Sequence, residues 1–267
     1  MGVEERPVPE PTAGHFPVRV HAATANQLAN SLRTATFGAP PPPPVLGNEG
    51  PGTVEASDTL PAGTRVALCG HRNLGVTAGF HQQWVSVPAS RLLPLPGGIG
   101  FDECAALAVN FLTAYLALTN AAQLQHGQTV LISGATGGLG SALIQTARAL
   151  GTRPIALLST AHKAQRALDI AAEAAIDLSA RDLATAVAEA TGGQEADAAL
   201  DPAGGVRLGE LLRAVQPRGT VVSLGCTGGK QAELGIVDLL MGEKHLHRLR
   251  RPRRTRGSDC PGAEEDR

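Results

Sequence analysis

The stretch that decides the fold is residues 129–150, TVLISGATGGLGSALIQTARAL. It opens with a short apolar run, residues 130–132, of the kind that forms a buried strand. A turn with four glycines follows, and then apolar residues recur at helical spacing: Leu143, Ile144, Ala147 and Leu150. Glycines let a backbone approach a pyrophosphate, and the N–H groups at a helix start attract its charge. This order predicts a dinucleotide-binding site; the alternative is a tight turn in another α/β domain.

The composition of the 267 residues narrows the possible functions. A hydrophobic content of 43% suffices for a core, and a formal net charge of −1 gives no argument for nucleic acid or an anionic membrane. Aromatic residues make up only 3%, so a base-stacking surface is not expected. The four cysteines are scattered without C-x-x-C spacing, and neither a signal peptide nor a membrane-length apolar run is evident. We therefore expect a soluble cytoplasmic protein.

The hydrophobic pattern divides the chain into three parts. Residues 1–100 hold short strand-like runs separated by glycine and proline, which predicts a small β-rich domain. Residues 101–243 begin with a long helical stretch, 101–122, and continue with alternating strands and helices, which predicts a doubly wound parallel sheet. The expected strands are 129–133, 153–159, 174–178, 196–201 and 219–225, with helices near 138–150, 161–171, 181–191 and 206–214.

The tail, residues 244–267, has a different composition. Residues 244–256 hold seven of the chain's 23 lysines and arginines and show no apolar periodicity. A nucleic-acid or membrane arm is one interpretation. Because the run carries no partner motif, we favour a disordered, solvated tail.

Several motifs, in order, resemble the zinc-independent branch of the medium-chain dehydrogenase/reductase superfamily, which holds quinone oxidoreductases and enoyl-thioester reductases. They are VPEPTAGHFPVRVHA (8–22), LGNEGPGTV (46–54), LAVNFLTAYLAL (107–118), VLISGATGGLGSALIQTARALG (130–151), HKAQRALDIAAEAAIDLSARD (162–182) and ALDPAGG (199–205). The resemblance implies an α/β fold, with a GroES-like catalytic domain over 1–100 that lacks the opening strand and a Rossmann NADP-binding domain over 101–243. The closing strands of the family are also missing, so we expect a chain truncated or altered at both ends, as a shifted reading frame would produce.

Zinc-dependent relatives place metal ligands at three points of this framework. Where they carry a cysteine, this chain has Thr24 to Asn26, and where they carry His-Glu it has Asn48-Glu49. Their third ligand falls near Val109. A catalytic zinc needs three protein ligands with nitrogen, sulfur or oxygen donors, so no metal site is expected.

The end of the second strand of the parallel sheet implies NADPH as the cofactor. No acidic residue for ribose hydroxyls stands there, whereas Ser159 and Lys163 resemble the family residues that hold the 2′-phosphate. A family tyrosine after the third strand is Leu178 here. Lys163 could instead be an exposed helix lysine, and Thr113 could bond only to its own helix. The other implied cofactor-binding residues are Thr113, Ala135, Thr136, Gly137, Gly138, Leu139, Gly140, Leu224 and Gly225.

By resemblance, the reaction is hydride transfer to a quinone or another conjugated carbonyl without zinc. Asn26 matches a family asparagine of the cleft and is the candidate substrate contact. The second candidate function is an enoyl-thioester reductase, which would need a tyrosine where this chain has Phe37. The third candidate is a catalytically incomplete remnant that binds NADPH. The loops around Phe37 and Leu74 are expected to form the substrate pocket. A homodimer paired through the nucleotide domain is also implied, with no membrane partner and nucleic acid unexpected.

Overall fold

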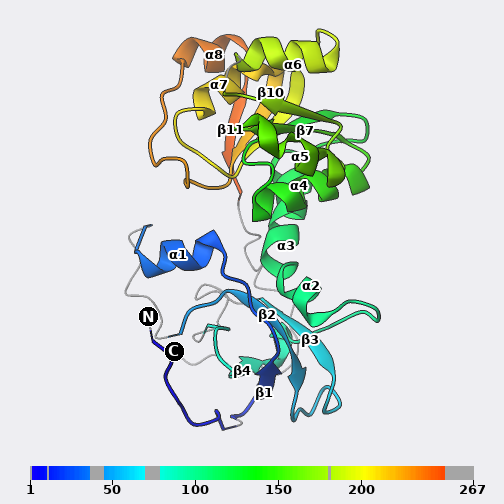
Figure 1. The fold of residues 1–267 in the computed structure, drawn as a ribbon, viewed down its shortest axis with the longest axis vertical. Helices are drawn as coiled ribbons and strands as arrows, with labels where there is room; N and C mark the ends of the chain where they lie inside the picture. The colour runs from blue at the N-terminus through cyan, green and yellow to red at the C-terminus, as the bar shows by residue number, and fades with distance from the viewer. Residues whose placement is uncertain (1, 11, 37–44, 70–78, 180–181, 250–267) are drawn as a thin grey trace.

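Two sheets organise the chain in a computed structural model that describes residues 2–10, 12–36, 45–69, 79–179 and 182–249 (Figure 1). The first is a five-stranded antiparallel sheet in the order β4 (Trp84–Pro88), β1 (His15–Val20), β2 (Glu49–Val54), β3 (Arg65–Cys69) and β5 (Leu93–Pro94). The second is a six-stranded parallel sheet in the order β11 (His245–Arg248), β10 (Val215–Ser223), β9 (Ala196–Asp201), β6 (Thr129–Ile132), β7 (Arg153–Leu158) and β8 (Ala174–Asp177). The predicted fold class is confirmed.

The β-rich domain buries alternate residues of its strands. Val66 and Leu68 of β3 point inward, as do Val85 and Val87 of β4, because successive side chains of a strand face opposite sides. Val18 of β1 is opposite Val54 on one side and Val85 on the other. A short helix, α1 (Gln27–Arg33), follows β1, and a 3₁₀ turn, η2 (Ala89–Arg91), follows β4.

The link between the domains is less regular than the sequence predicts. The expected helix over 101–122 is divided into α2 (Phe101–Ala105), α3 (Ala108–Leu116) and a π-helical turn, η3 (Ala117–Ala121). The break has a physical reason, because the N–H of Val109, in the first turn of α3, donates to the carboxylate of Glu49 on β2 instead of to a helical carbonyl.

Helices cover both faces of the parallel sheet, as predicted. α4 (Gly138–Ala149) and α5 (Ala164–Asp169, preceded by the 3₁₀ turn η4, Ala161–Lys163) pack with α3 in one hydrophobic cluster; α6 (Leu183–Thr191) and α7 (Leu208–Ala214) pack in the other. Strand β6 contributes to both, since Val130 and Ile132 face α4 and Leu131 faces the opposite side. The strand expected at 219 begins at Val215, with a register shift before Thr220 that the sequence pattern did not reveal.

The tail prediction is wrong for its first residues. His245–Arg248 form β11, which pairs in parallel with β10 at the edge of the sheet, although all four residues are exposed. Backbone pairing needs no apolar periodicity, and the ammonium group of Lys244 anchors the start of the strand by donating to the carbonyls of Leu212 and Arg213 at the end of α7. Residues 250–267 lie outside the described residues.

Candidate active site

The predicted glycine turn joins β6 to α4 at the C-terminal edge of the sheet. Gly134 has a φ of +55°, and its carbonyl accepts from the N–H of Gly137 at 2.9 Å. Gly134, Gly137 and Gly138 are exposed. No side chain of the described residues caps the start of the 12-residue helix α4, so its first N–H groups are available to an anion.

Gly140, the last glycine of the turn, is buried for a different reason. A Cβ atom on Gly140 would lie 2.2 Å from the carbonyl oxygen of Gly134 and 2.7 Å from the Cα of Ala135. Both are backbone atoms, so the first turn of α4 can pack against the glycine turn only without a side chain at this position.

A buried carboxylate stands where the chain order reverses, between β9 and β6. Asp201, 1% exposed, closes β9, and its Oδ1 accepts from the Ser133 hydroxyl and from the N–H groups of Ala203 (3.1 Å) and Gly204 (3.0 Å). Its Oδ2 has no hydrogen-bond partner among the residues that the structure describes. Ligands of open α/β sheets bind in the crevice at such a switch point.

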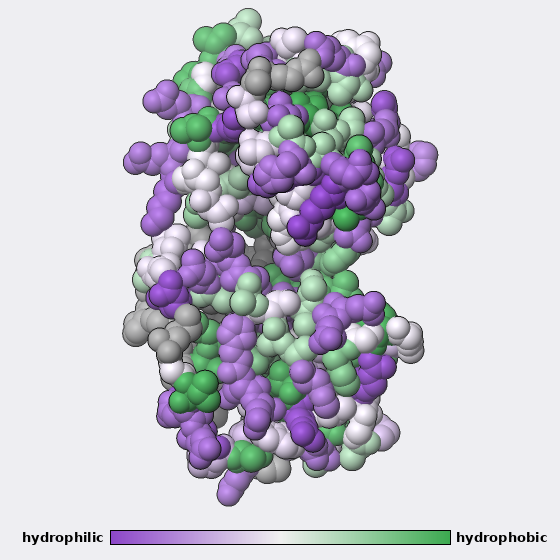
Figure 2. Space-filling view, viewed as in Figure 1, coloured by the Kyte–Doolittle hydropathy of each residue, from purple (hydrophilic) through white to green (hydrophobic). Residues whose placement is uncertain are grey.

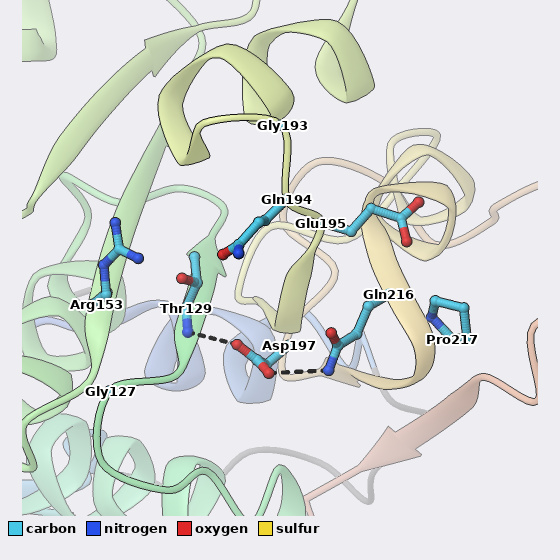
Figure 3. A pocket seen from close by; sticks show the side chains of 9 residues that line it. All are labelled: Gly127, Thr129, Arg153, Gly193, Gln194, Glu195, Asp197, Gln216 and Pro217. Carbon is cyan, nitrogen blue, oxygen red and sulfur yellow. Dashed lines mark hydrogen bonds between the residues drawn. The ribbon is translucent and has the colours of Figure 1, made fainter.

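A cavity lies at the opposite edge of the sheet, where the parallel strands begin (Figure 3). It measures about 620 Å³, and its polar wall contains Asp197, which accepts from the N–H of Thr129 at 2.8 Å and from the amide groups of Gln128 and Gln216 at 3.0 Å each. These donors satisfy the carboxylate and tie together β6, β9 and β10. This edge is therefore a structural clamp rather than the predicted cofactor site.

The two residues expected at the 2′-phosphate are neighbours in the structure. The ammonium group of Lys163 donates to the hydroxyl of Ser159 at 3.1 Å, directly after β7. The hydroxyl of Thr160, which sequence reasoning missed, is buried and has no partner among the described residues. Hydrogen bonds from the backbone and side chain of Ser179, and from the Ala161 N–H, hold the pKa of Asp177 below its usual value beside this loop.

Two of the residues expected near the nicotinamide, Leu224 and Gly225, also lie at this edge. The N–H of Leu224 donates to the carbonyl of Asp201 at 2.9 Å, and a Cβ on Gly225 would lie 2.2 Å from the carbonyl of Pro202. The loops after β9 and β10 thus run in close contact. Thr113 bonds to its own helix, through its hydroxyl and the Val109 carbonyl at 2.5 Å.

Asn26 belongs to a polar cluster centred on Glu49 in the β-rich domain. Glu49 is fully buried and accepts from the Thr24 hydroxyl (2.8 Å), the Asn26 amide (3.2 Å) and the Val109 N–H (2.5 Å). The Asn26 carbonyl oxygen accepts in turn from the Asn48 amide (2.9 Å) and the Ala29 N–H (3.0 Å). The backbone carbonyl of Val109 also accepts from the hydroxyl of Thr113, a predicted cofactor-binding residue. A chain of hydrogen bonds therefore runs from Asn26 through Glu49 and Val109 to Thr113.

The same cluster contains residues from the three points at which the resemblance places the metal ligands of zinc-dependent relatives. Its donor set, a threonine, two asparagines and one carboxylate, does not fit a catalytic zinc, and no group of three or more histidine, cysteine or acidic residues within the described ranges could hold a metal. Burial raises the pKa of the neighbouring Cys104 thiol, and the charge of Glu49 adds to that effect while Arg65 opposes it. A thiol kept protonated is a poor metal ligand.

Comparisons with known proteins find relatives of both domains. The family model described as "Alcohol dehydrogenase GroES-like domain" matches residues 12–97, and the model described as "Zinc-binding dehydrogenase" matches residues 138–262. The quinone oxidoreductase of Pseudomonas aeruginosa is 33% identical over 224 residues, which cover 82% of this chain and 67% of the relative. Quinone oxidoreductase 1 of Escherichia coli is 30% identical over 235 residues, which cover 86% of this chain and 70% of the relative.

A solved structure supports the same relationship. The Escherichia coli quinone oxidoreductase, crystallised with NADPH, aligns with a TM-score of 0.82 at 27% sequence identity, covering 92% of this chain and 75% of that one. Three findings indicate the same protein family: the GroES-like domain, the parallel sheet of nucleotide-binding type, and the relatives at 30–33% identity. The chain therefore belongs to the medium-chain dehydrogenase/reductase superfamily, among the quinone oxidoreductase-like enzymes.

Proposed function

We propose that this chain is an NADPH-dependent oxidoreductase that reduces a quinone or another conjugated carbonyl without zinc. The observation that carries the proposal is the exposed glycine turn before the uncapped helix α4, at the switch point of the parallel sheet. The Escherichia coli relative crystallised with NADPH supports this choice of cofactor. NADPH supplies the hydride when it is bound, and the protein positions the reactants and excludes water.

The cofactor contacts follow from the geometry of the sheet edge. We assign the pyrophosphate to the N–H groups of residues 138–140, and the 2′-phosphate to Ser159 and Lys163, whose hydroxyl and cation suit a dianion. The buried hydroxyl of Thr160, which has no partner among the described residues, directly follows Ser159 in the sequence. The nicotinamide side is assigned to Thr113, Leu224 and Gly225. Of the residues in this site, Ala135, Thr136 and Leu139 contribute backbone to the turn.

Asn26 is proposed to contact the substrate through its amide. Its oxygen accepts two hydrogen bonds and one amide hydrogen is held by Glu49, which fixes the side chain and leaves the second amide hydrogen without a partner in the described part of the chain. This hydrogen can donate to a substrate carbonyl and polarise it, the task that zinc performs in zinc-dependent relatives. The proton donor for the reduced product is then solvent.

The proposal is tested by fluorescence titration of the protein with NADPH and with NADH, followed by addition of 1,4-benzoquinone. We expect saturable NADPH binding, weaker NADH binding, and oxidation of NADPH that a chelator does not reduce. Binding without oxidation would identify a catalytically incomplete remnant. If neither nucleotide binds, the proposed function is wrong.

Asp201 is expected to support NADPH binding through the crevice it organises. In Asp201→Ala, the Ser133 hydroxyl and the Gly204 N–H lose their acceptor, and the Ala203 N–H keeps only a long bond of 3.4 Å to the Ser133 hydroxyl oxygen. The Kd for NADPH should therefore rise about tenfold, and stability should fall by about 1–3 kcal/mol. The matched control is Asp197→Ala, at the other end of β9, which also removes three hydrogen bonds. Calorimetric melting and NADPH titration should show loss of stability in both variants but a higher Kd only for Asp201→Ala. An equal Kd for the two would contradict the role.

We also propose a homodimer formed through the edge of the nucleotide domain. Within the described residues, strand β11 is an edge strand with one side of its backbone unpaired. The neighbouring α8 (Ile236–Met241) exposes four apolar side chains by 64–81% of their area: Ile236, Val237, Leu240 and Met241. Figure 2 shows apolar residues on this outer end of the domain, and an edge strand of a second copy would extend the sheet over it. Sedimentation velocity distinguishes dimer from monomer.

No helix in the described ranges is long and apolar enough to span a bilayer. The scattered cysteines of the sequence, which lack C-x-x-C spacing, suit the cytoplasmic location that we propose.

A further inference from the structure

Arg207 stands at the beginning of α7, at the C-terminal edge of the parallel sheet. Its guanidinium donates to the Glu210 carboxylate at 3.0 Å and to the carbonyl of Leu178 at 3.2 Å. The side chain is 43% exposed, so a ligand can reach it. It therefore extends from α7 to the segment that follows β8.

The contact with Leu178 places this cation beside the proposed 2′-phosphate site. The N–H of Leu178 donates to the carbonyl of Leu158 at 2.9 Å, and Leu158 is the last residue of β7, directly before Ser159. Lys163 bonds to Ser159 from η4. Lys163 thus bonds directly to the residue after β7, and Arg207 bonds to Leu178, which pairs with the last residue of β7.

The charge of the 2′-phosphate favours a second cation, Arg207, in addition to Lys163. A 2′-phosphate is close to a dianion near neutral pH, and the carboxylate of Asp177 bonds to the N–H of Ala161 within the same loop region. Lys163 supplies a single positive charge, so a second cation would complete the balance against the dianion. Arg207 has five N–H donors, of which two make the bonds described above, so the guanidinium retains donors for phosphate oxygens.

We propose that Arg207 is a specificity-determining residue that binds the 2′-phosphate of NADPH opposite Lys163. The family tyrosine expected after the third strand is Leu178 in this chain. The backbone carbonyl of Leu178 instead holds the guanidinium of Arg207 in place. The inference rests on the proposed NADPH site and adds to it a contact with the one group that distinguishes NADPH from NADH.

The test compares the Kd values of NADPH and NADH for the wild-type chain, Arg207→Gln and Arg207→Lys. Arg207→Gln should raise the Kd for NADPH about tenfold and leave the Kd for NADH unchanged, because only NADPH carries the phosphate. Arg207→Lys should recover part of the loss by restoring the charge. The matched control is Glu210→Gln, which removes the ion-pair partner but keeps the guanidinium, and it should bind NADPH at least as tightly as the wild type.

Other results of these titrations distinguish failure of the Arg207 proposal from failure of the proposed function. An equal loss of NADPH and NADH binding in Arg207→Gln would overturn the proposal, because it would mean contact with the adenosine or a disturbed fold. Unchanged affinity for both would also overturn it, since Arg207 would then be only a surface ion pair. Failure of the wild-type chain to bind either nucleotide would refute the proposed function itself.

Discussion

Replacing Gly140 with alanine is expected to raise the Kd for NADPH at least a hundredfold. The added Cβ would lie 2.2 Å from the Gly134 carbonyl oxygen and 2.7 Å from the Ala135 Cα, and neither backbone atom can yield without displacing the glycine turn. Moving the turn by the required distance misdirects the N–H groups at the start of α4, on which the pyrophosphate contact depends. A hundredfold loss corresponds to about 2.7 kcal/mol of binding free energy. Fluorescence titration measures it directly.

Two other glycines make controls for this substitution. Gly97→Ala adds the same atom where nothing lies within 4 Å, and it should leave the Kd and the thermal midpoint unchanged. Gly138→Ala adds it inside the turn, 3.3 Å from the Asn110 side-chain amide, which can rotate away, so its effect should be intermediate. Wild-type affinity in Gly140→Ala would show that this turn does not hold the cofactor.

The nucleotide domain is well predicted from sequence because its signals are local. A parallel strand buried on both faces is a continuous apolar run, and the helix after it shows an apolar face, so β6 and α4 can be placed within a residue or two. The glycine turn between them follows from the same short segment. The helices and strands that follow repeat this pattern at regular intervals.

The features that sequence reasoning missed depend on contacts between distant segments. Glu49 meets Val109 across 60 positions of sequence, and this contact is what separates α2 from α3. Arg207 meets Leu178 across 29 positions. Strand β11 is stabilised by backbone pairing with β10 and by the capping lysine before it, which leave no hydrophobic pattern to detect.

Thr113 shows the limit of transferring a role by resemblance. The sequence offers both a cofactor contact and a bond to its own helix, and in the structure its hydroxyl makes the second. A threonine oxygen that donates to a backbone carbonyl can still accept, so the proposed cofactor role requires it to act as an acceptor there. Whether Asn26 contacts the substrate depends similarly on its remaining amide hydrogen. Phe37 and Leu74, expected in the pocket wall, lie outside the described residues.

Removal of the Glu49 carboxylate should separate catalysis from cofactor binding. In Glu49→Ala, the Thr24 hydroxyl, the Asn26 amide and the Val109 N–H all lose their acceptor in a fully buried position. We expect the free energy of unfolding to fall by about 3 kcal/mol or more, because buried donors are left without partners. Quinone reduction should fall further than NADPH binding, since Asn26 loses its orientation while the glycine turn lies in the other domain.

Thermal unfolding, NADPH titration and steady-state quinone reduction together test this expectation. Glu55→Ala is the control, because Glu55 follows β2 directly but is exposed, and it should behave as the wild type in all three measurements. Glu49→Gln should be intermediate, because all of its neighbours are donors and one would then face the new amide nitrogen. If Glu49→Gln keeps full stability and full quinone reduction, the charge of Glu49 is not needed to hold Asn26. If Glu49→Ala instead weakens NADPH binding as much as catalysis, the cluster serves the nucleotide domain rather than the substrate.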